Sequence, residues 1–396
     1  MVRALLRRVA TSVGRCRAHP VASTVSTRSF PAAAGRTHPS LALNLLPIAT
    51  VRGFASSSAG IFDVAQVLNA KETSTDDRVA AINSIDLSSS LDKAERKRHA
   101  LEVVDSDALE ALLGFLQDSD TITSSDLLVP AFLALIRLTT EPLLVQELLR
   151  LNASKILTPF LTQTNPRLQA AACLTLGNVA LEPTAADVVS SPDVVSAALS
   201  VLASPHEAIK RAACTCVASI ASSAQGRRQI IEQDGVLLLG GLLEDDYSDQ
   251  LRSAAAFTLG NILSGRDIDA QDLLRESGAL PALVLLLSPA FPEDVNSSAA
   301  WAVHHGVHLN IASQSLVADA GGLGMLIQHL ASGALESLQT NALLALESTV
   351  ISHDENLEWC RDNDADEVLQ CVQATDGDSL NDNAKRALSS LLKKLK

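Results

Sequence analysis

The chain has 396 residues and carries 45 acidic against 31 basic side chains, so its net charge of −14 argues against binding to nucleic acid, which needs a basic surface. Aromatic residues make up only 3% of the chain, so leucine, valine and alanine must fill the core. The six cysteines are scattered, which argues against a disulfide framework, and no apolar run is long enough to span a bilayer.

The N-terminal segment has a composition of its own. Residues 1–60 contain eight arginines, no lysine and no acid, and the first acid is Asp63. An arginine-rich, acid-free start that can form an amphipathic helix is typical of an organellar transit peptide. We expect residues 1–54 to be a disordered transit peptide, cut after Phe54 in RGFAS, with a second candidate site after Phe30 in RSFPA. The alternative is a disordered basic tail.

The transit peptide predicts a mitochondrial location, in the matrix, with a plastid or the cytosol as alternatives. Its removal takes away eight basic residues and no acid, which leaves 23 basic against 45 acidic residues and a net charge of −22. Such a surface favours a basic partner or simple solubility. Residues 55–74 are predicted to be a short linker to the rest of the chain.

An alanine-rich apolar segment then recurs at a nearly constant spacing. It is QAAACLTLGNVA at 169–180, KRAACTCVASIA at 210–221 and RSAAAFTLGNIL at 252–263. Seven copies, 41 to 44 residues apart, are found from the first large apolar residue of each, namely Leu127, Leu168, Ile209, Leu251, Val295, Leu338 and Leu380. Such a period indicates a repeat protein, in which each repeat buries its faces against its neighbours.

Each copy follows one pattern of three helices. We predict a long helix in each, near 127–139, 168–180, 209–221, 251–263, 295–308, 338–350 and 380–395. A polar break, a short amphipathic helix such as QDLLRES and a second apolar helix such as LPALVLLL follow. Between the two shorter helices stands a residue suited to a left-handed conformation, at Asn152, Gly235, Gly278 or Gly321.

Three helices in about 42 residues match the period of the armadillo family. The segments NPRLQAAACLTLGNVA at 165–180 and SDQLRSAAAFTLGNIL at 248–263 resemble its third helix, and ESGALPALVLLL at 276–287 resembles its first-to-second helix junction. The resemblance implies an all-α fold, a right-handed superhelical solenoid of about seven armadillo-type repeats over residues 75–396. It does not by itself imply a particular function.

The third helices carry a second stripe beside the core face. In the first quoted segment Leu174 and Asn178 lie four residues apart on one face, and the core face is assigned to Leu168, Ala172, Leu176 and Val179. We therefore expect Asn178 to turn towards the inner surface of the stack. The same stripe in other copies gives the predicted partner-binding residues Arg137, Asn178, Ser219, Phe257, Asn261, Trp301, His305 and Ser348.

A resemblance to importin α suggests what such a stripe does. In that family the paired positions hold tryptophan and asparagine, and the amides bind the backbone of an extended peptide. This chain keeps the amide only at Asn178 and Asn261 and the indole only at Trp301, so a regular ladder for lysine-rich signals is not expected. The alternative is that the two asparagines bond the loops between repeats.

The other motifs do not indicate a metal site, a phosphate site or a catalytic site. His304 and His308 in AVHHGVH are four residues apart, but no Cys or acid completes a metal set at a usual spacing. DNDADE at 362–367 lacks the glycine and final acid of a calcium loop and is predicted to be a solvated turn. GGLG at 321–324 is assigned to a helix junction, and RKR at 96–98 to an exposed helix face. We predict no enzyme activity, no cofactor and no metal.

The sequence therefore predicts a non-catalytic scaffold or adaptor in mitochondria that binds a protein or peptide along a concave groove. It predicts no nucleic-acid binding and no membrane insertion. One alternative is a permanent structural subunit or assembly factor of a mitochondrial enzyme complex. Another is a cargo adaptor of the importin α kind in the cytosol and nucleus.

Overall fold

The computed structural model describes residues 63–70, 72–85, 92–117, 125–377 and 379–396. Within these ranges the chain forms 23 α-helices and two short 3-10 helices, and no strand, so the predicted all-α class is confirmed. The predicted transit peptide lies outside the described residues. None of the described helices combines the length and the apolar character needed to cross a membrane.

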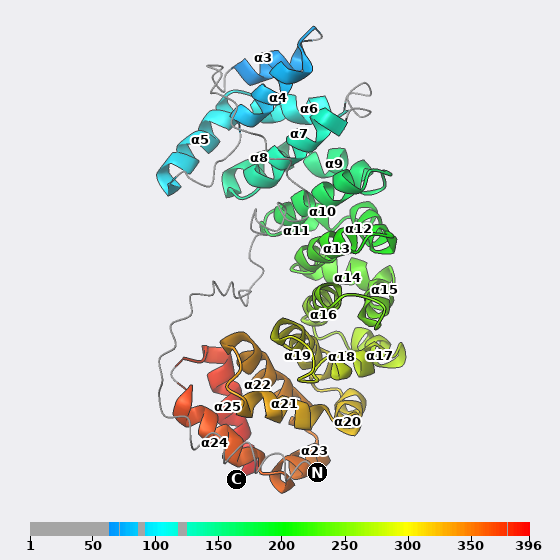
Figure 1. Cartoon of the computed structure of the whole chain (residues 1–396), viewed down its shortest axis with the longest axis vertical. Helices are drawn as coiled ribbons and strands as arrows, with labels where there is room; N and C mark the ends of the chain where they lie inside the picture. Colours follow the sequence, from blue (N-terminus) through cyan, green and yellow to red (C-terminus); the bar gives the residue numbers. More distant parts are fainter. Residues whose placement is uncertain (1–62, 71, 86–91, 118–124, 378) are drawn as a thin grey trace. The chain divides into compact units, whose positions relative to one another are not determined.

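The chain divides into two compact units, the first reaching Gln233 and the second running from Asp234 to Lys396. Figure 1 labels their helices in chain order. The first unit contains α3 (Val64–Asn69), α4 (Thr75–Ser84), α5 (Lys93–Asp105), α6 (Ala108–Gln117), α7 (Ser125–Leu138), α8 (Pro142–Arg150), α9 (Ala153–Leu161), α10 (Pro166–Ala180), α11 (Ala186–Val189), α12 (Pro192–Ser200), η2 (Val201–Ala203), α13 (Glu207–Ile220) and α14 (Ala224–Glu232).

The second unit continues the same sequence of long and short helices. It contains α15 (Gly235–Gly240), η3 (Gly241–Leu243), α16 (Asp249–Leu263), α17 (Ile268–Glu276), α18 (Ala279–Leu285), α19 (Glu293–Val307), α20 (Ile311–Asp319), α21 (Gly322–Ala331), α22 (Glu336–Val350), α23 (Asp354–Asp362), α24 (Ala365–Thr375) and α25 (Asp382–Leu395). The seven long helices from α7 to α25 begin and end within two residues of their predicted bounds.

Within each unit a helix packs against the helix three places further along the chain. In the first unit α4 packs on α7, α7 on α10 and α10 on α13; in the second, α16 packs on α19, α19 on α22 and α22 on α25. The repeating unit is therefore three helices, as predicted. We call α4, α7, α10, α13, α16, α19, α22 and α25 the third helices.

The predicted linker at 55–74 is wrong in its second half, because α3 lies there and packs on α4 and α6. Val64 and Leu68 of α3 are buried. Helices α3 and α4 form a partial copy that precedes the seven predicted ones. It escapes the sequence period because α4 begins at Thr75 and α7 only at Ser125, a wider spacing than separates the later third helices.

The left-handed residue between the two shorter helices is confirmed at Asn152, Gly278 and Gly321. At the fourth predicted junction the left-handed residue is Asp234, with φ 59°, and Gly235 is already helical. The prediction for Gly235 is therefore wrong by one residue. Aspartate tolerates this conformation better than most side chains, because its carboxylate can bond locally to the backbone.

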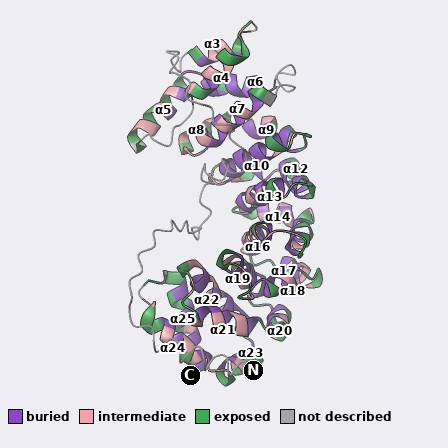
Figure 2. Ribbon diagram, in the orientation of Figure 1, coloured by how far each residue is buried: buried purple, intermediate pink, exposed green. Residues whose placement is uncertain are grey.

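Apolar aliphatic side chains fill the core between repeats, and Figure 2 shows how burial follows the helices. The predicted core face of α10, formed by Leu168, Ala172, Leu176 and Val179, is buried. Cys173, Cys214 and Cys216 are buried free thiols, as expected of small apolar side chains. A hydrogen bond with Cys216 and burial raise the pKa of the Cys173 thiol, which keeps it protonated.

Candidate functional site

The third helices of the second unit have a narrow, partly exposed face beside their buried ones. It includes Phe257 and Asn261 on α16, Ser297, Trp301 and His304 on α19, His308 directly after α19, and Asn341, Leu344 and Glu347 on α22. These residues follow one another at intervals of three or four within each helix, as one helical face requires. We call this surface the third-helix face.

The structure separates the eight predicted binding residues into two groups. Arg137, Phe257, Asn261 and Trp301 are partly exposed, whereas Asn178, Ser219, His305 and Ser348 are buried. The prediction that all eight line a surface stripe is therefore wrong for Asn178, Ser219 and Ser348, whereas His305, although buried, lines the pocket beside Trp301. The helix turns once in 3.6 residues, so the exposed face can continue after three residues where the stripe was drawn after four.

Sequence reasoning consequently missed several exposed residues, and on two helices it selected a buried neighbour in their place. On α19 the face of Trp301 continues at His304 instead of His305, and on α22 the face of Leu344 continues at Glu347 instead of Ser348. A three-residue step from Trp301 would have found His304. The sequence signal was ambiguous, because both steps of three and of four keep residues on one side of a helix.

Asn178 connects neighbouring repeats inside the first unit. Its side chain is fully buried, and Nδ2 donates to the carbonyl oxygen of Ile136 at 3.3 Å and to Oγ1 of Thr139 at 3.0 Å. Ile136 lies in the last turn of α7, where helical carbonyls lack partners in their own helix, and Thr139 directly follows that helix. The alternative of an asparagine that bonds a neighbouring repeat therefore holds for Asn178.

Asn261 holds the indole of Trp301 in the second unit. Its Oδ1 accepts a hydrogen bond from Nε1 of Trp301 at 3.1 Å. The indole lies directly on Gly260, where a Cβ atom would come within 2.2 Å of Trp301 Cδ1. The His305 ring meets the indole edge-on, with 4.2 Å between ring centroids. Three neighbours thus fix the orientation of Trp301, while part of its surface stays exposed.

His304 connects α19 to α22. Its Nδ1 lies 2.6 Å from Oγ of Ser348 and 3.0 Å from the carbonyl oxygen of Leu344. Burial lowers the pKa of His304 to about 4, against the opposing effect of the hydrogen bond to Leu344. The ring is therefore neutral at pH 7. Because Ser348 is buried, this serine–histidine pair joins two helices and presents no accessible nucleophile.

An open pocket of about 330 Å³ adjoins Trp301. It is lined by Trp301, His304 and His305 of α19, His308 directly after that helix, Leu344 and Glu347 of α22, Asn383 and Arg386 of α25, and Arg266 from the loop after α16. The lining combines aromatic and aliphatic side chains with charged ones. That combination suits a partner side chain that has an apolar body and a polar end.

The other singled-out motifs have structural placements. The imidazoles of His304 and His308 are 6.2 Å apart between ring centroids, and no three His, Cys, Asp or Glu side chains gather for a metal in the described ranges. Only Asn363 and Asp364 of the segment DNDADE form the predicted turn between α23 and α24, and its other four residues belong to the two helices. In GGLG, Gly321 stands at the junction before α21 and the other three residues begin that helix. RKR lies in α5, with Lys97 and Arg98 exposed.

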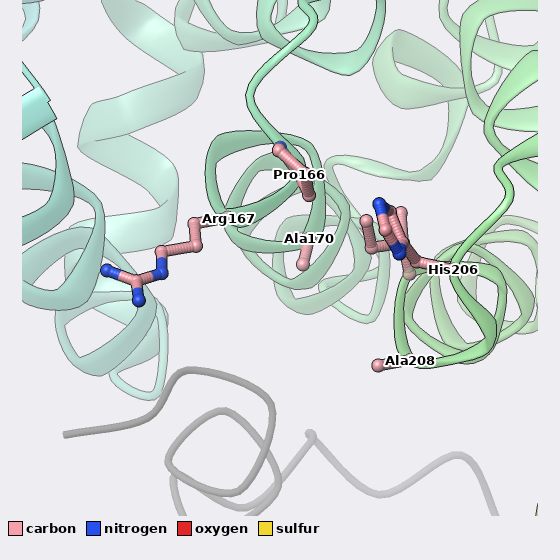
Figure 3. A pocket seen from close by; sticks show the side chains of 6 residues that line it. Pro166, Arg167, Ala170, His206 and Ala208 are labelled. Carbon is pink, nitrogen blue, oxygen red and sulfur yellow. The ribbon is translucent and has the colours of Figure 1, made fainter.

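A second, smaller pocket of about 220 Å³ lies in the first unit. It is formed where α10 and α13 begin, by Pro166, Arg167, Ala170, His206, Ala208 and Ile209. In Figure 3 the Arg167 side chain points away from the other labelled residues. Apart from Arg167 and His206 the lining is apolar, so this pocket offers little for recognition of a polar ligand.

Comparison with known proteins supports the fold over most of the chain and indicates a function only through a short match. No protein-family model matches the chain. Among curated proteins it resembles importin subunit alpha-1b of Oryza sativa subsp. japonica, with 39% identity over 105 residues. That match covers 26% of this chain and 19% of the relative, so it spans only about a fifth of the relative's length.

Solved structures resemble the chain over most of its length. An engineered protein matches with a TM-score of 0.67 and 21% identity, covering 85% of this chain and 88% of its own. A designed armadillo repeat protein matches with a TM-score of 0.55 and 22% identity, covering 61% of this chain and 98% of its own. The chain therefore has an armadillo-type repeat fold, a solenoid of three-helix repeats.

Proposed function

We propose that the chain is a non-catalytic protein-binding scaffold, which holds a segment of a partner protein against the third-helix face of its second unit. The observation that carries this proposal is Trp301, a large aromatic side chain with a fixed orientation beside an open pocket. Aromatic anchors of this kind supply much of the energy of protein interfaces. Stacked repeats also offer extended surfaces that commonly bind other proteins.

The proposed location is the mitochondrion. It rests on the arginine-rich, acid-free composition of residues 1–54. A fusion of residues 1–60 to a reporter should enter mitochondria and be cut after Phe54, and an uncut fusion that stays in the cytosol would contradict this part of the proposal.

The binding role is tested by affinity capture from isolated mitochondria with the wild-type chain and two variants. Trp301→Ala should reduce recovery of the specific partner at least tenfold, because a hot-spot aromatic contributes about 2 kcal/mol or more. Trp359→Ala is the matched control, since it removes the other tryptophan, a partly buried residue of α23 that does not line the pocket.

The outcome is read together with thermal melts of both variants. If Trp301→Ala melts many degrees lower and its folded fraction still captures the partner as well as the wild type, Trp301 is a packing residue and this face is not the binding site. Size-exclusion chromatography of the native protein separates a transient adaptor from a permanent subunit, which would remain in one large complex.

The similarity to importin subunit alpha-1b favours a second candidate, a cargo adaptor for basic segments. That function predicts binding to lysine-rich peptides and a full-length protein found in the cytosol and nucleus. The incomplete set of asparagines and tryptophans on the third helices counts against it. Imaging of the full-length chain distinguishes this candidate from the mitochondrial scaffold.

A further inference from the structure

The pocket beside Trp301 is bordered by basic side chains, although the chain as a whole is acidic. Arg266 lines it from the loop after α16, and Arg386 lines it from α25. Both are exposed. Lys393 follows Arg386 by seven residues on α25, so it lies on the same helical face, and it is exposed too. Two cations thus line the pocket, and a third lies on the same face of α25 as Arg386.

The two arginines of the pocket are not neutralised by the protein itself. In the described part of the chain no carboxylate lies within 4.0 Å of the guanidinium of Arg266 or Arg386. Arg386 bonds instead to the carbonyl oxygen of Asp382 and to Oδ1 of Asn383. Arg252 and Arg275, by contrast, each pair with a carboxylate of their own helix.

The other charged groups near the pocket do not make its net charge negative. Glu347 is the carboxylate among its lining residues, and Asp382 is exposed at the start of α25. His304 and His308 add no positive charge at neutral pH, because burial lowers the pKa of both rings. The lining therefore holds two guanidinium groups against one carboxylate.

We propose that this pocket binds a partner segment whose acidic side chain pairs with Arg266 and Arg386 while an adjacent apolar side chain packs on Trp301 and Leu344. A guanidinium can bind a carboxylate through two parallel hydrogen bonds, which gives both affinity and orientation. The inference rests on the proposed protein-binding function and specifies the chemistry of the partner. At this site the inferred partner segment is acidic, whereas the overall negative charge of the chain favours a basic partner.

The test uses isothermal titration calorimetry of the full chain with three synthetic peptides. The first carries glutamates around one leucine in a glycine–serine background, the second has glutamine in place of each glutamate, and the third has lysine. The acidic peptide should bind about tenfold more tightly than the glutamine peptide at low ionic strength. This preference should shrink as salt screens the pairing of exposed charges.

Charge-removing variants locate the binding. Arg266→Gln and Arg386→Gln should each weaken binding of the acidic peptide by about threefold, and the double variant by about tenfold, in line with exposed ion pairs. Arg228→Gln is the matched control, because it removes an exposed arginine of α14 that does not line the pocket. It should bind like the wild type.

Three results would overturn the inference. They are equal or tighter binding of the glutamine or lysine peptide, undiminished binding of the acidic peptide to the double variant, and no binding of the acidic peptide at about 1 mM, the weak end of specific affinities. Binding through the arginines of residues 1–54 gives the second result. The proposed function would still stand if capture of the mitochondrial partner depends on Trp301.

Discussion

Asn178 and Asn261 occupy the same position in their repeats, yet each bonds a different neighbour. Asn178 donates to the end of the preceding third helix, at Ile136 and Thr139, whereas Asn261 accepts from Trp301 on the following one. Because the two side chains differ in burial, the two hydrogen bonds contribute differently to the stability of the protein. Asn178 is enclosed, so a lost bond there cannot be replaced by water, while Asn261 is partly exposed.

Asn178→Ala should therefore destabilise the protein by about 1–3 kcal/mol, and Asn261→Ala by about 1 kcal/mol or less. The reason is that buried polar groups left without partners pay their full desolvation cost. Chemical denaturation followed by far-UV circular dichroism measures both values. Equal losses in the two variants would contradict the assignment of Asn178 to the structure and Asn261 to the surface.

The low pKa of His304 predicts how stability depends on pH. Its folded pKa of about 4 lies below the ordinary value of 6.5, so the unfolded chain binds the extra proton between these two pH values. The contribution of neutral His304 to the free energy of unfolding is fully present above pH 6.5. It is lost as the pH drops towards 4, by about 3 kcal/mol in total. His308 shifts in the same direction.

Denaturation curves at several pH values between 7.5 and 4.5 check this expectation. His304→Gln removes the titrating group and should flatten the curve over this range, at the cost of some stability at pH 7.5. A wild-type and a variant curve with the same slope would show that His304 does not control the response.

At the scale of the helix, the glycine of the TLGN motif allows the next third helix to approach closely. A Cβ atom at Gly177 would lie 3.2 Å from the backbone Cα of Cys216, and one at Gly260 would lie 2.2 Å from the ring of Trp301. In both copies of the motif the glycine thus leaves room for an atom of the next third helix, although the neighbouring residue differs.

Gly260→Ala should displace the Trp301 ring and destabilise the second unit by about 1–3 kcal/mol, the usual cost of overpacking. Gly241→Ala is the matched control, because nothing lies within 4 Å of a Cβ there and its φ of −64° suits alanine. That change should be neutral or stabilise by up to about 1 kcal/mol. Thermal melts that fall equally in both variants would contradict the contact at Gly260.

The helices and their core faces were predictable because apolar periodicity over seven copies determines both. Leu168, Ala172, Leu176 and Val179 are buried as expected. The exposed faces could not be predicted in the same way. A step of three residues from Trp301 leads to His304 and a step of four leads to His305, and packing against α16 and α22 determines which of the two is exposed. The contact of Trp301 with Gly260 joins two different repeats, so it left no signal in the local sequence of either helix.

On the scale of the whole molecule, the contacts between neighbouring repeats predict how damage spreads. Leu176 on α10 is fully buried, and α10 packs on α7 and α13 within the first unit. Leu176→Asp places a charge in that core and should cost several kcal/mol. Because coupling in a repeat stack runs between neighbours, loss should be largest near α10.

Hydrogen exchange followed by mass spectrometry measures this spread. Protection should fall most in α7, α10 and α13, and α19, α22 and α25 of the second unit should keep theirs. Leu237→Asp is the matched control, since Leu237 is 41% exposed on α15 and should alter little. Uniform loss of protection over all described helices would show that the chain unfolds as one cooperative block.

The fixed position of Trp301 also gives the protein an optical probe of its own pocket. The chain has two tryptophans, Trp301 and Trp359, so Trp359→Phe leaves a single indole. Its emission would then report on the third-helix face alone, without any attached dye. A partner side chain that covers the ring would shift the spectrum to the blue, and protonation of the adjoining imidazoles would quench it.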